Sequence, residues 1–324
     1  MGFEAELVNR VEALAAVVSY LAVRRFAAIP TLTERLVWQH LREFDRKPHH
    51  YSIELGSSQE PVRFLYADLP WDSTFFDMKM VRLQAVLFEA NVSSATLSKA
   101  VRNFVAVLAA SNVAHCYCEV AAKDPVLLYA LGQAGWSVVE SRLHYYHDTL
   151  DQLPIARYKV RAALPNDAES LRAVSAANRN RFDRFHADPV FSLGQADRFL
   201  GEYAAAATRG FCDVVLVPDE RIIDSFLAIN HLDNDASLLQ TKLGRVVLTA
   251  VGLQNRGWHR KLLTETLWYT RERGGEVVFM TTQATNGAVI HNAQQVGFKL
   301  GELTHIVSCR PSRGSFITTS IVSV

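Results

Sequence analysis

The sequence has little cysteine and almost no net charge, and both scarcities exclude classes of protein. Among 324 residues there are four cysteines, and 34 Lys plus Arg nearly balance 33 Asp plus Glu, for a formal net charge of +1. Cys116 and Cys118 stand too close together for a zinc knuckle, and no His/Cys pair elsewhere completes a ligand set, so no metal site is expected. A nucleic-acid partner is not expected either, because such proteins carry a basic excess.

Long apolar runs and targeting signals are also missing. The longest apolar run, Ala13 to Val23, is interrupted by Ser19 and is too short to span a bilayer. Glu4 and Glu6 stand where a secretory signal peptide would carry basic residues. We therefore expect a cytoplasmic protein with no membrane partner. With 49% hydrophobic residues, the chain is long enough for two domains with hydrophobic cores.

The N-terminal fifty or so residues are expected to be helical. Apolar residues at steps of three and four predict an amphipathic helix over Phe3 to Phe26, ended by Pro30. A second helix is predicted over Thr31 to Phe44. We expect these helices to pack against the domain that follows.

An internal repeat is the main sign of organisation in the rest of the chain. Asp124 is followed eleven positions later by Gly135-Trp136, and Asn286, 162 positions after Asp124, is followed eleven positions later by Gly297-Phe298. In each copy a strand precedes a short helix, and another strand follows the Gly-aromatic turn, because Gly can adopt the positive φ that ends a helix. The strands that open the two copies are Cys116 to Val120 and Val277 to Thr281. The repeat predicts a duplicated α+β domain.

The remaining patterns describe the second copy, after an interruption at Pro154. They predict strands at Val160 to Ala163, Val214 to Val217, Ile222 to Ile229 and Arg245 to Thr249, and a helix at Leu171 to Asn178. We predict three parts: an N-terminal helical extension (1–50), a first half (51–152) and a second half (153–324).

The loop after the strand at 245–249 carries the chemistry. Gln254-Asn255-Arg256-Gly257-Trp258-His259 leads into a helix predicted from Arg260 to Arg273. The unpaired N–H groups and the dipole of a helix N-terminus can hold a pyrophosphate. Gly257 lets the backbone approach a phosphate closely, and Arg256 and Arg260 add positive charge. Taken alone, one Gly at a strand–helix junction is more often a plain helix start.

The order of features around this loop resembles the GNAT superfamily of N-acyltransferases. Over about Tyr158 to Val307 the order is strand, Gln-x-x-Gly-x-His, helix, strand, Asn286, helix and Gly297-Phe298. The resemblance implies an α+β fold of tandem GNAT-like mixed-sheet domains with flanking helices, and acetyl-CoA or a longer acyl-CoA as co-substrate. It implies a loop that binds the pyrophosphate, an Asn that contacts the pantetheine arm, and strand backbone that polarises the thioester carbonyl. These residues are Gln254, Asn255, Arg256, Gly257, Trp258 and His259 in the loop, Asn286, and Thr249, Ala250 and Val251 in the strand.

A narrower resemblance concerns the acceptor. Arg184-Phe185-His186-Ala187-Asp188-Pro189 and the segment from Leu69 to Phe76 are similar to the dTDP-fucosamine acetyltransferase family, which acylates the amine of nucleotide-linked amino sugars. That family has a degenerate first half without the coenzyme loop, and here no Gly-containing loop precedes Leu97 to Ala110. The implied substrate-binding residues are Trp71, Asp72, Phe76, Arg181, Arg184, Phe185 and Asp188. Trp71 or Phe76 would suit a stack on thymine, and core packing is the other interpretation.

The sequence also departs from the superfamily. His259 replaces the last Gly or Ala of the loop signature, and it either donates to a phosphate or packs outward. Many members carry a Tyr seven residues after the Asn as general acid, and here that position is Ala293. The general acid is therefore not identified.

Two histidines are the catalytic candidates. His186 stands in a loop, and an imidazole can accept a proton near neutral pH, so it is expected to act as a base or to position the sugar. The other interpretation is a brace for the turn at Asp188-Pro189. His291, little more than one helical turn after Asn286, either replaces the missing Tyr or is an ordinary surface residue.

The sequence thus predicts an N-acyltransferase for a dTDP-linked amino-deoxysugar in glycan biosynthesis. An acyltransferase for another small-molecule or peptide amine is the second prediction, and a catalytically inactive CoA-binding module is the third. A homodimer is left open.

Overall fold

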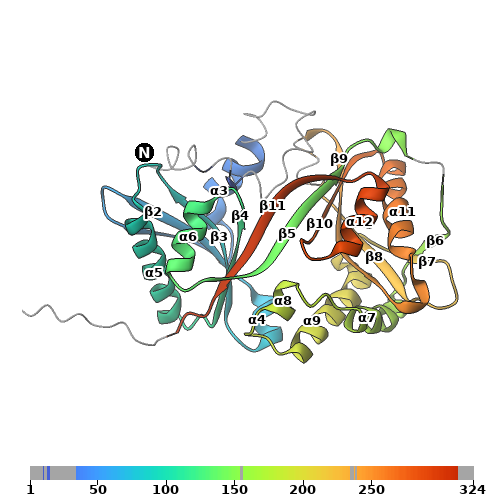
Figure 1. Cartoon of the computed structure of the whole chain (residues 1–324), viewed down its shortest axis with the longest axis horizontal. Coiled ribbons are helices and arrows are strands. Elements are labelled where there is room, and N and C mark those ends of the chain that lie inside the picture. Colours follow the sequence, from blue (N-terminus) through green and yellow to red (C-terminus); the bar gives the residue numbers. More distant parts are fainter. Residues whose placement is uncertain are drawn as a thin grey trace, which may run out of the picture.

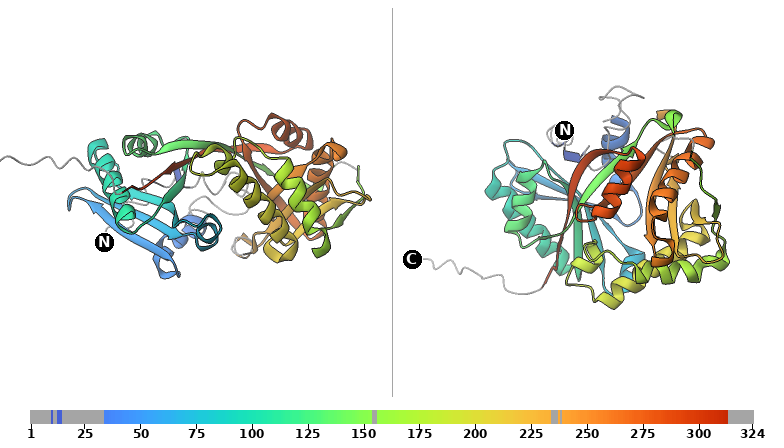
Figure 2. Two further views of the ribbon diagram at one scale, coloured as in Figure 1. Left: turned by 90° about the horizontal axis from the view of Figure 1, so that it is seen from below. Right: turned by 45° about the vertical axis from the view of Figure 1, so that its right-hand side comes forward.

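The computed structural model describes Arg10 and residues 13–14, 34–153, 156–233, 237 and 239–312. In these residues the strands form one 11-stranded mixed sheet, ordered β1-β2-β3-β4-β11-β5-β10-β9-β8-β7-β6 (Figure 1). Helices lie on both faces, and the two halves lie side by side along the sheet (Figure 2). The predicted α+β fold with a mixed sheet is confirmed.

The first half runs from β1 to β5. Its strands are β1 (His50–Gly56), β2 (Pro61–Asp68), β3 (Met80–Phe88), β4 (His115–Ala121) and β5 (Ser137–His147). Its helices are α4 (Pro70–Phe76), α5 (Ser94–Ala110) and α6 (Pro125–Gln133). Buried residues of α5 and α6, among them Leu97, Phe104 and Leu131, pack on one face of the strands.

The second half runs from β6 to β11. Its strands are β6 (Val160–Ala162), β7 (Val214–Pro218), β8 (Ser225–His231), β9 (Lys242–Val251), β10 (Gly275–Gln283) and β11 (Lys299–Cys309). Its helices are α7 (Ala168–Ala177), α8 (Arg184–Ala187), α9 (Leu193–Ala206), α11 (Trp258–Glu272) and α12 (Gly287–Val296). Short helical turns, η4 (Leu150–Gln152), η5 (Pro165–Asp167), η6 (Ala207–Phe211) and η7 (Leu253–Asn255), connect them. The predicted strands and helices are confirmed to within a few residues, except that β8 begins three residues after the predicted Ile222.

Part of the predicted N-terminal helical region is described. The segment 34–46 forms η2 (Glu34–Trp38), α3 (Gln39–Arg42) and η3 (Phe44–Arg46), in place of one continuous helix. Val37, Leu41 and Phe44 pack in one core with residues of both halves, such as Leu87 and Phe279. The expected packing is therefore confirmed for this segment. Of the helix predicted over Phe3 to Phe26, only Arg10 and residues 13–14 lie within the described residues, and these are helical.

The internal repeat is confirmed at the level of helix caps. The side chain of Asp124 accepts from the Leu127 N–H at 3.2 Å at the start of α6, and the side chain of Asn286 accepts from the Val289 N–H at 3.2 Å at the start of α12. Gly135 and Gly297 end the two helices with φ of 84° and 96°, which L side chains rarely adopt.

The last strand of each half is exchanged with the other half. β5, from the first half, pairs antiparallel with β10, and β11, from the second half, pairs antiparallel with β4. β5 and β11 also pair with each other along most of their length, and they cross the centre of the molecule together (Figure 1). The predicted boundary between residues 152 and 153 stays a prediction. β5 precedes this boundary but pairs with β10 of the second half, and β11 follows it but pairs with β4 of the first half.

Both halves contain a pair of parallel strands that separate at equivalent positions. β3 and β4 pair only as far as Leu83 and Cys118, and β9 and β10 only as far as Val246 and Met280. A β-bulge lies beside each separation, at Gln84 in β3 and at Val247 in β9. Bulges increase local twist and end pairing, so they help to part the strands. Each half therefore opens a gap in the sheet.

Candidate functional site

The gap between β9 and β10 opens into a cleft of about 410 Å³. Its walls are the end of β9, the loop after α7, and the first turns of α11 and α12. The lining residues are Asn178, Arg179, Asn180, Arg181, Phe182, Thr249, Ala250, Val251, His259, Thr285, Asn286, Gly287, Ala288, Val289 and Asn292. The structure thus brings together five of the predicted coenzyme residues: Thr249, Ala250, Val251, His259 and Asn286.

A second cleft of about 190 Å³ continues along the separated strands. It shares Asn178, Thr249 and Asn286 with the larger cleft and adds Thr281 and Gln283 from β10. Beyond Val246 the β9 backbone has no ladder partner on the β10 side. Backbone groups of β9 are therefore available to a ligand in the gap, as the thioester carbonyl would require.

The loop before α11 is partly closed by its own hydrogen bonds. The Gln254 N–H donates to Asp224 Oδ2 at 2.7 Å, and the Gly252 N–H donates to the Asp224 carbonyl at 2.6 Å. Asn255 is 3% exposed, and its side chain bonds Asp224, Ser225 and Glu220. The Gln254 N–H and the Asn255 side chain therefore shape the loop and are not available to a pyrophosphate, while a coenzyme contact by another group of Gln254 or Asn255 stays a prediction.

The end of the loop is open. α11 begins after Gly257, which has φ of 88°, and no side chain caps its first N–H groups. Uncapped N–H groups and the helix dipole attract an anion. Arg256 and Arg260 are exposed beside this end, and Arg181 is exposed on the opposite wall of the larger cleft. These positions suit the phosphates of a coenzyme. Arg181 was predicted to bind the acceptor, but it lines the same cleft as the predicted coenzyme residues.

Two loop side chains take different orientations. The Trp258 side chain is 8% exposed and packs in the core with α11, so only its backbone N–H, at the start of α11, is left for the predicted coenzyme contact. His259 lines the cleft, and burial lowers its pKa to about 4, so the imidazole is neutral at neutral pH. The Asn292 amide lies 3.2 Å from His259 Nδ1, which suits a donated hydrogen bond and leaves the proton on Nε2. This buried Nε2 has no partner among the described residues. A buried donor without a partner costs about 1–3 kcal/mol, so His259 fits a site that an acceptor group of CoA would complete.

In the first half, a side chain of the protein itself lies in the gap. A space of about 200 Å³ lies between β3 and β4, and Arg10 enters it. Arg10 Nε donates to the Val86 carbonyl at 3.2 Å, and the guanidinium pairs with Asp124 and stacks 4.4 Å from the Phe88 ring. The helix that follows, α5, is capped by Ser93, whose hydroxyl accepts from the Thr96 N–H at 3.1 Å.

A carboxylate also covers the start of α5. Glu60 accepts from the Ser93 N–H at 2.9 Å and from the Thr96 hydroxyl. Two N–H groups at the start of α5, those of Ser93 and Thr96, are thus bonded to side chains, whereas the start of α11 has no side-chain cap. An anionic ligand has no place at this end, in agreement with the predicted degenerate first half.

The predicted aromatic acceptor site is an interface between the halves. Phe76 of α4 is 4% exposed and stacks on Phe185 and Phe199 at 5.7 and 5.1 Å. Phe185 is buried in the same cluster. Trp71 is 46% exposed, but its ring packs edge-on against Phe199, at 4.8 Å, and it does not line either cleft. For Phe76 the core-packing interpretation therefore replaces the stack on a base, because its ring and that of Phe185 hold α4 against α8 and α9.

The polar residues of the same segments also bind across this interface. Asp188 accepts from the Ser308 hydroxyl at 2.6 Å and lies 2.9 Å from His115 Nε2. Arg184 stacks 4.1 Å from the Tyr117 ring. Burial raises the pKa of Asp72, although Arg184 and His115 act against this. The substrate roles of Asp72, Arg184 and Asp188 stay predictions.

His186 is held between two carboxylates. Its Nδ1 lies 2.6 Å from Asp183 Oδ2 and its Nε2 lies 3.0 Å from Asp197 Oδ1, with the side chain fully covered. Burial alone would lower the pKa of His186, but the hydrogen bonds and charges of Asp183 and Asp197 raise it above its ordinary value. A charged ring with both nitrogens bonded is a poor base, so the interpretation as a brace replaces the catalytic one.

The residues on α12 give no catalytic group. His291 is exposed and lines neither cleft, so it does not replace the missing Tyr in this geometry. Ala293 is fully buried in the core behind α12. Asn292, between them, lines the larger cleft and bonds His259.

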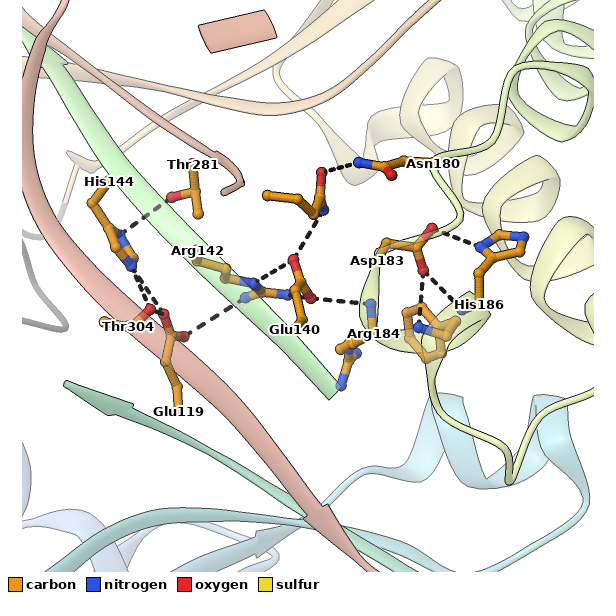
Figure 3. A network of polar contacts seen from close by, with 12 residues as sticks. Glu119, Glu140, Arg142, His144, Asn180, Asp183, Arg184, His186, Thr281 and Thr304 are labelled. Carbon is orange, nitrogen blue, oxygen red and sulfur yellow. Dashed lines mark hydrogen bonds and ion pairs between the residues drawn. The ribbon is translucent and has the colours of Figure 1, made fainter. Parts of the chain in front are cut away.

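A polar network beside the smaller cleft was missed from the sequence. Glu140 accepts from Arg142 Nε and Nη2 at 2.9 Å and from Gln283 Nε2 at 2.9 Å, and Asn180 donates to Gln283 at 2.7 Å (Figure 3). Arg142 lies 3.7 Å from Glu119, and Glu119 lies 3.1 Å from His144, so the network extends to His144 of β5. A signal was present: Glu140, Arg142 and His144 alternate along a strand that has neighbours on both sides.

The described part of the chain has neither a cluster of metal ligands nor a helix that could span a membrane. It holds no group of three or more His, Cys, Asp or Glu side chains that could bind a metal ion. None of its helices has the length and hydropathy needed to cross a membrane.

Similarity to known proteins is found in the fold. No protein-family model matches the sequence, and no curated protein matches it. A GCN5-related N-acetyltransferase from Sphaerobacter thermophilus has 12% identity and a TM-score of 0.54, with 96% of this chain and 94% of that chain covered. A conserved protein of unknown function from Staphylococcus epidermidis has 12% identity and a TM-score of 0.53, with 82% and 97% covered.

A third structure belongs to a larger protein. It is a fungal multi-domain GH3 β-N-acetylglucosaminidase with a GCN5-related glucosamine N-acetyltransferase region, at 12% identity and a TM-score of 0.55. The match covers 91% of this chain and 37% of that protein. Together with the repeated strand–helix–strand units and the two separated strand pairs, these similarities show that the chain has a tandem GNAT-like fold.

Proposed function

We propose that this chain is an acyl-CoA-dependent N-acyltransferase that acts on the primary amine of an amino sugar. The observation that carries the proposal is the contrast between the two gaps. In one gap Arg10 is bound to groups of the protein and the helix beyond is capped, whereas the other gap opens onto an uncapped helix with basic residues beside it.

The chain's own groups have distinct roles in this proposal. The first N–H groups of α11, with Arg256, Arg260 and Arg181, bind the phosphates of the coenzyme. His259 Nε2–H donates to an oxygen of the same ligand, and free backbone groups of β9 hold the acyl carbonyl. Acyl-CoA, when bound, supplies an acyl group on a thioester whose thiol can leave. The protein holds this group and the amine together, and such positioning accounts for much of the rate.

The acceptor class rests on two similarities. The segments at 69–76 and 184–189 resemble enzymes for dTDP-linked amino sugars, and one structural neighbour is described as a glucosamine N-acetyltransferase region. A dTDP-linked amino-deoxysugar is the acceptor that we propose, with cytoplasmic glycan biosynthesis as the setting. A free amino sugar and a peptide amine are the alternatives.

Calorimetric titration with CoA and a thiol-release assay test the proposal in two steps. We expect CoA to bind at micromolar or tighter Kd, and thiol release from acetyl-CoA to depend on an added amine. The amines compared are a dTDP-linked amino sugar, glucosamine and a peptide with a free N-terminus. Absence of CoA binding contradicts the proposal.

A second candidate function is a CoA-binding module without activity. It is favoured by Ala293, which stands in the core where many GNAT enzymes have a catalytic Tyr. CoA binding without thiol release from any of the amines supports this candidate.

A further inference from the structure

His144 is one of several buried histidines, and it lies beside the separated strands β9 and β10. His144 lies in the middle of β5, the strand that the first half contributes to the sheet of the second half. It is 8% exposed and pairs in the β ladder with Thr281 of β10, beside the separated end of that strand. A buried polar ring in a strand interior needs hydrogen-bond partners, and these partners define its state.

One nitrogen of His144 is held by two neighbours. Nε2 lies 2.8 Å from Thr304 Oγ1 and 3.1 Å from Glu119 Oε1. The Thr304 hydroxyl donates to the same Glu119 oxygen at 2.7 Å. Because the hydroxyl proton is directed to the carboxylate, Thr304 and Glu119 both act as acceptors toward Nε2. The proton of the neutral ring therefore lies on Nε2, and the lone pair lies on Nδ1.

The carboxylate that fixes this tautomer stays charged. Burial alone would raise the pKa of Glu119, but the hydrogen bond from His144 and the charge of Arg142, 3.7 Å away, lower it to about 2. Arg82 of β3 adds to this effect. Glu302 is the ladder partner of His144 on β11, and its carboxylate is paired with Lys123 Nζ at 2.9 Å.

The other nitrogen faces the candidate site. Nδ1 lies 3.4 Å from the Thr281 hydroxyl, and Thr281 is exposed and lines the smaller cleft together with Thr249. Figure 3 shows His144 turned toward Thr281 on one side and toward Glu119 and Thr304 on the other. His144 itself lines neither cleft, and the Thr281 hydroxyl connects its Nδ1 to the smaller one.

We propose that His144 Nδ1 is the general base of the reaction, with Glu119 and Thr304 as positioning residues. This inference rests on the proposed acyltransferase function. The acceptor enters as an ammonium ion and loses two protons overall as its new C–N bond replaces the C–S bond of the thioester. One proton passes to His144 Nδ1, directly or through the Thr281 hydroxyl, and then to water. The other goes to the sulfur of the departing CoA, so that amide, thiol and one released proton balance the reaction.

The strand exchange then has a functional consequence. The coenzyme cleft is built by the second half, whereas His144 and Glu119 both come from the first half. The degenerate half supplies the base in place of a coenzyme site, and neither half is complete without the other.

Replacement of His144 by Gln tests the proposal by kinetics. A general base contributes about 100- to 10,000-fold, so we expect kcat/KM at neutral pH to fall at least about 100-fold while the CoA Kd stays within twofold. The wild-type pH profile should contain a limb for loss of a proton from a single base, and H144Q should lose this limb. His305→Gln is the matched control: His305 follows Thr304 on β11, bonds Ser141 at 2.9 Å, and lies on the opposite face. H305Q should keep the wild-type rate and profile.

A second measurement needs no activity. In the free protein with ¹⁵N-labelled histidine, NMR should show the His144 ring, when neutral, protonated on Nε2, and Glu119→Gln should change this pattern. The signal is assigned by its loss in H144Q or, should that variant not fold, by its shift in Thr281→Val. A neutral ring protonated on Nδ1 overturns the proposal.

The outcomes distinguish failure of the acyltransferase function from failure of the role proposed for His144. If wild-type protein releases no thiol with any amine, the acyltransferase function itself fails. If wild-type protein is active and H144Q keeps its rate and pH profile, the enzyme stands and His144 is not its base.

Discussion

Each half of this molecule has a pair of parallel strands that separate beside a β-bulge. The halves differ in the side chains that lie around the gap between those strands. In both, the parallel strands separate at the same distance along the chain before the repeated helix, and a bulge lies beside the separation. In the first half Arg10, Ser93 and Glu60 satisfy the groups around the gap. In the second half the gap and the helix end stay open. The coenzyme site is therefore determined less by the backbone than by a few side chains that close it or leave it free.

The largest expected effect comes from closing the open end. Gly257→Glu would add a carboxylate where phosphates are expected, as Glu60 does beside α5, and should weaken CoA binding by about 100-fold or more, measured by calorimetry. Gly257→Asn controls for backbone strain, because Asn tolerates the positive φ. Ser94→Glu, at the start of α5, should leave the CoA Kd unchanged. Retention of wild-type affinity in Gly257→Glu contradicts the assignment of this helix end.

Opening the closed half should cost stability instead. Arg10→Ala leaves the Asp124 carboxylate buried without its partner, which should lower the free energy of unfolding by about 3 kcal/mol in urea titration. The double variant Arg10→Met with Asp124→Asn, which gives the first copy the Asn of the second, should recover most of this loss. CoA affinity should stay at the wild-type value in both. An unchanged unfolding free energy in Arg10→Ala would show that Arg10 does not support the first half.

The carboxylate beside His144 should make stability depend on pH. The folded-state pKa of Glu119 is lowered from 4.5 to about 2, so its contribution is present above pH 4.5 and is lost as pH falls toward 2. At neutral pH, Glu119→Gln should therefore cost on the order of 2–3 kcal/mol. The difference from wild type should shrink between pH 4.5 and 2 in unfolding titrations. A difference that stays constant over this range would mean that Glu119 is not held as an anion.

The smallest effects separate a cap from a binding residue. Ser93→Ala and Asn286→Ala each remove a helix cap and should each lower the free energy of unfolding by about 1 kcal/mol. Only Asn286→Ala should also weaken CoA binding, because Asn286 lines the cleft and Ser93 does not. Equal CoA affinity in the two variants would make Asn286 a cap alone.

Local pattern was enough to predict the repeated unit. Gly135 and Gly297 end helices by positive φ, and Asp124 and Asn286 begin them as caps. These features depend on neighbours within a few positions along the chain, so the sequence contains them directly. The same holds for Gly257 and the helix that follows it.

Side-chain partners far apart in sequence were not predictable in this way. The segment at 184–189 looked like a sugar site, but the fold brings Phe185 against Phe76 and Asp188 against His115, so these residues hold the halves together. His186 looked like a base until Asp183 and Asp197 enclosed it. Conversely, His144 lay in an ordinary strand pattern and became a candidate base only through its contact with Glu119.

What the sequence determined by itself is the order of strands and helices, the duplication, and a Gly-containing loop before a helix in one copy only. The tertiary structure decided which strand lies in which half of the sheet, and with it the contents of each gap. The physical reason is range: caps, turns and periodicity act over a few residues. The exchange of β5 and β11, and the pairing of Arg10 with Asp124 and of His144 with Glu119, form only when distant strands pair.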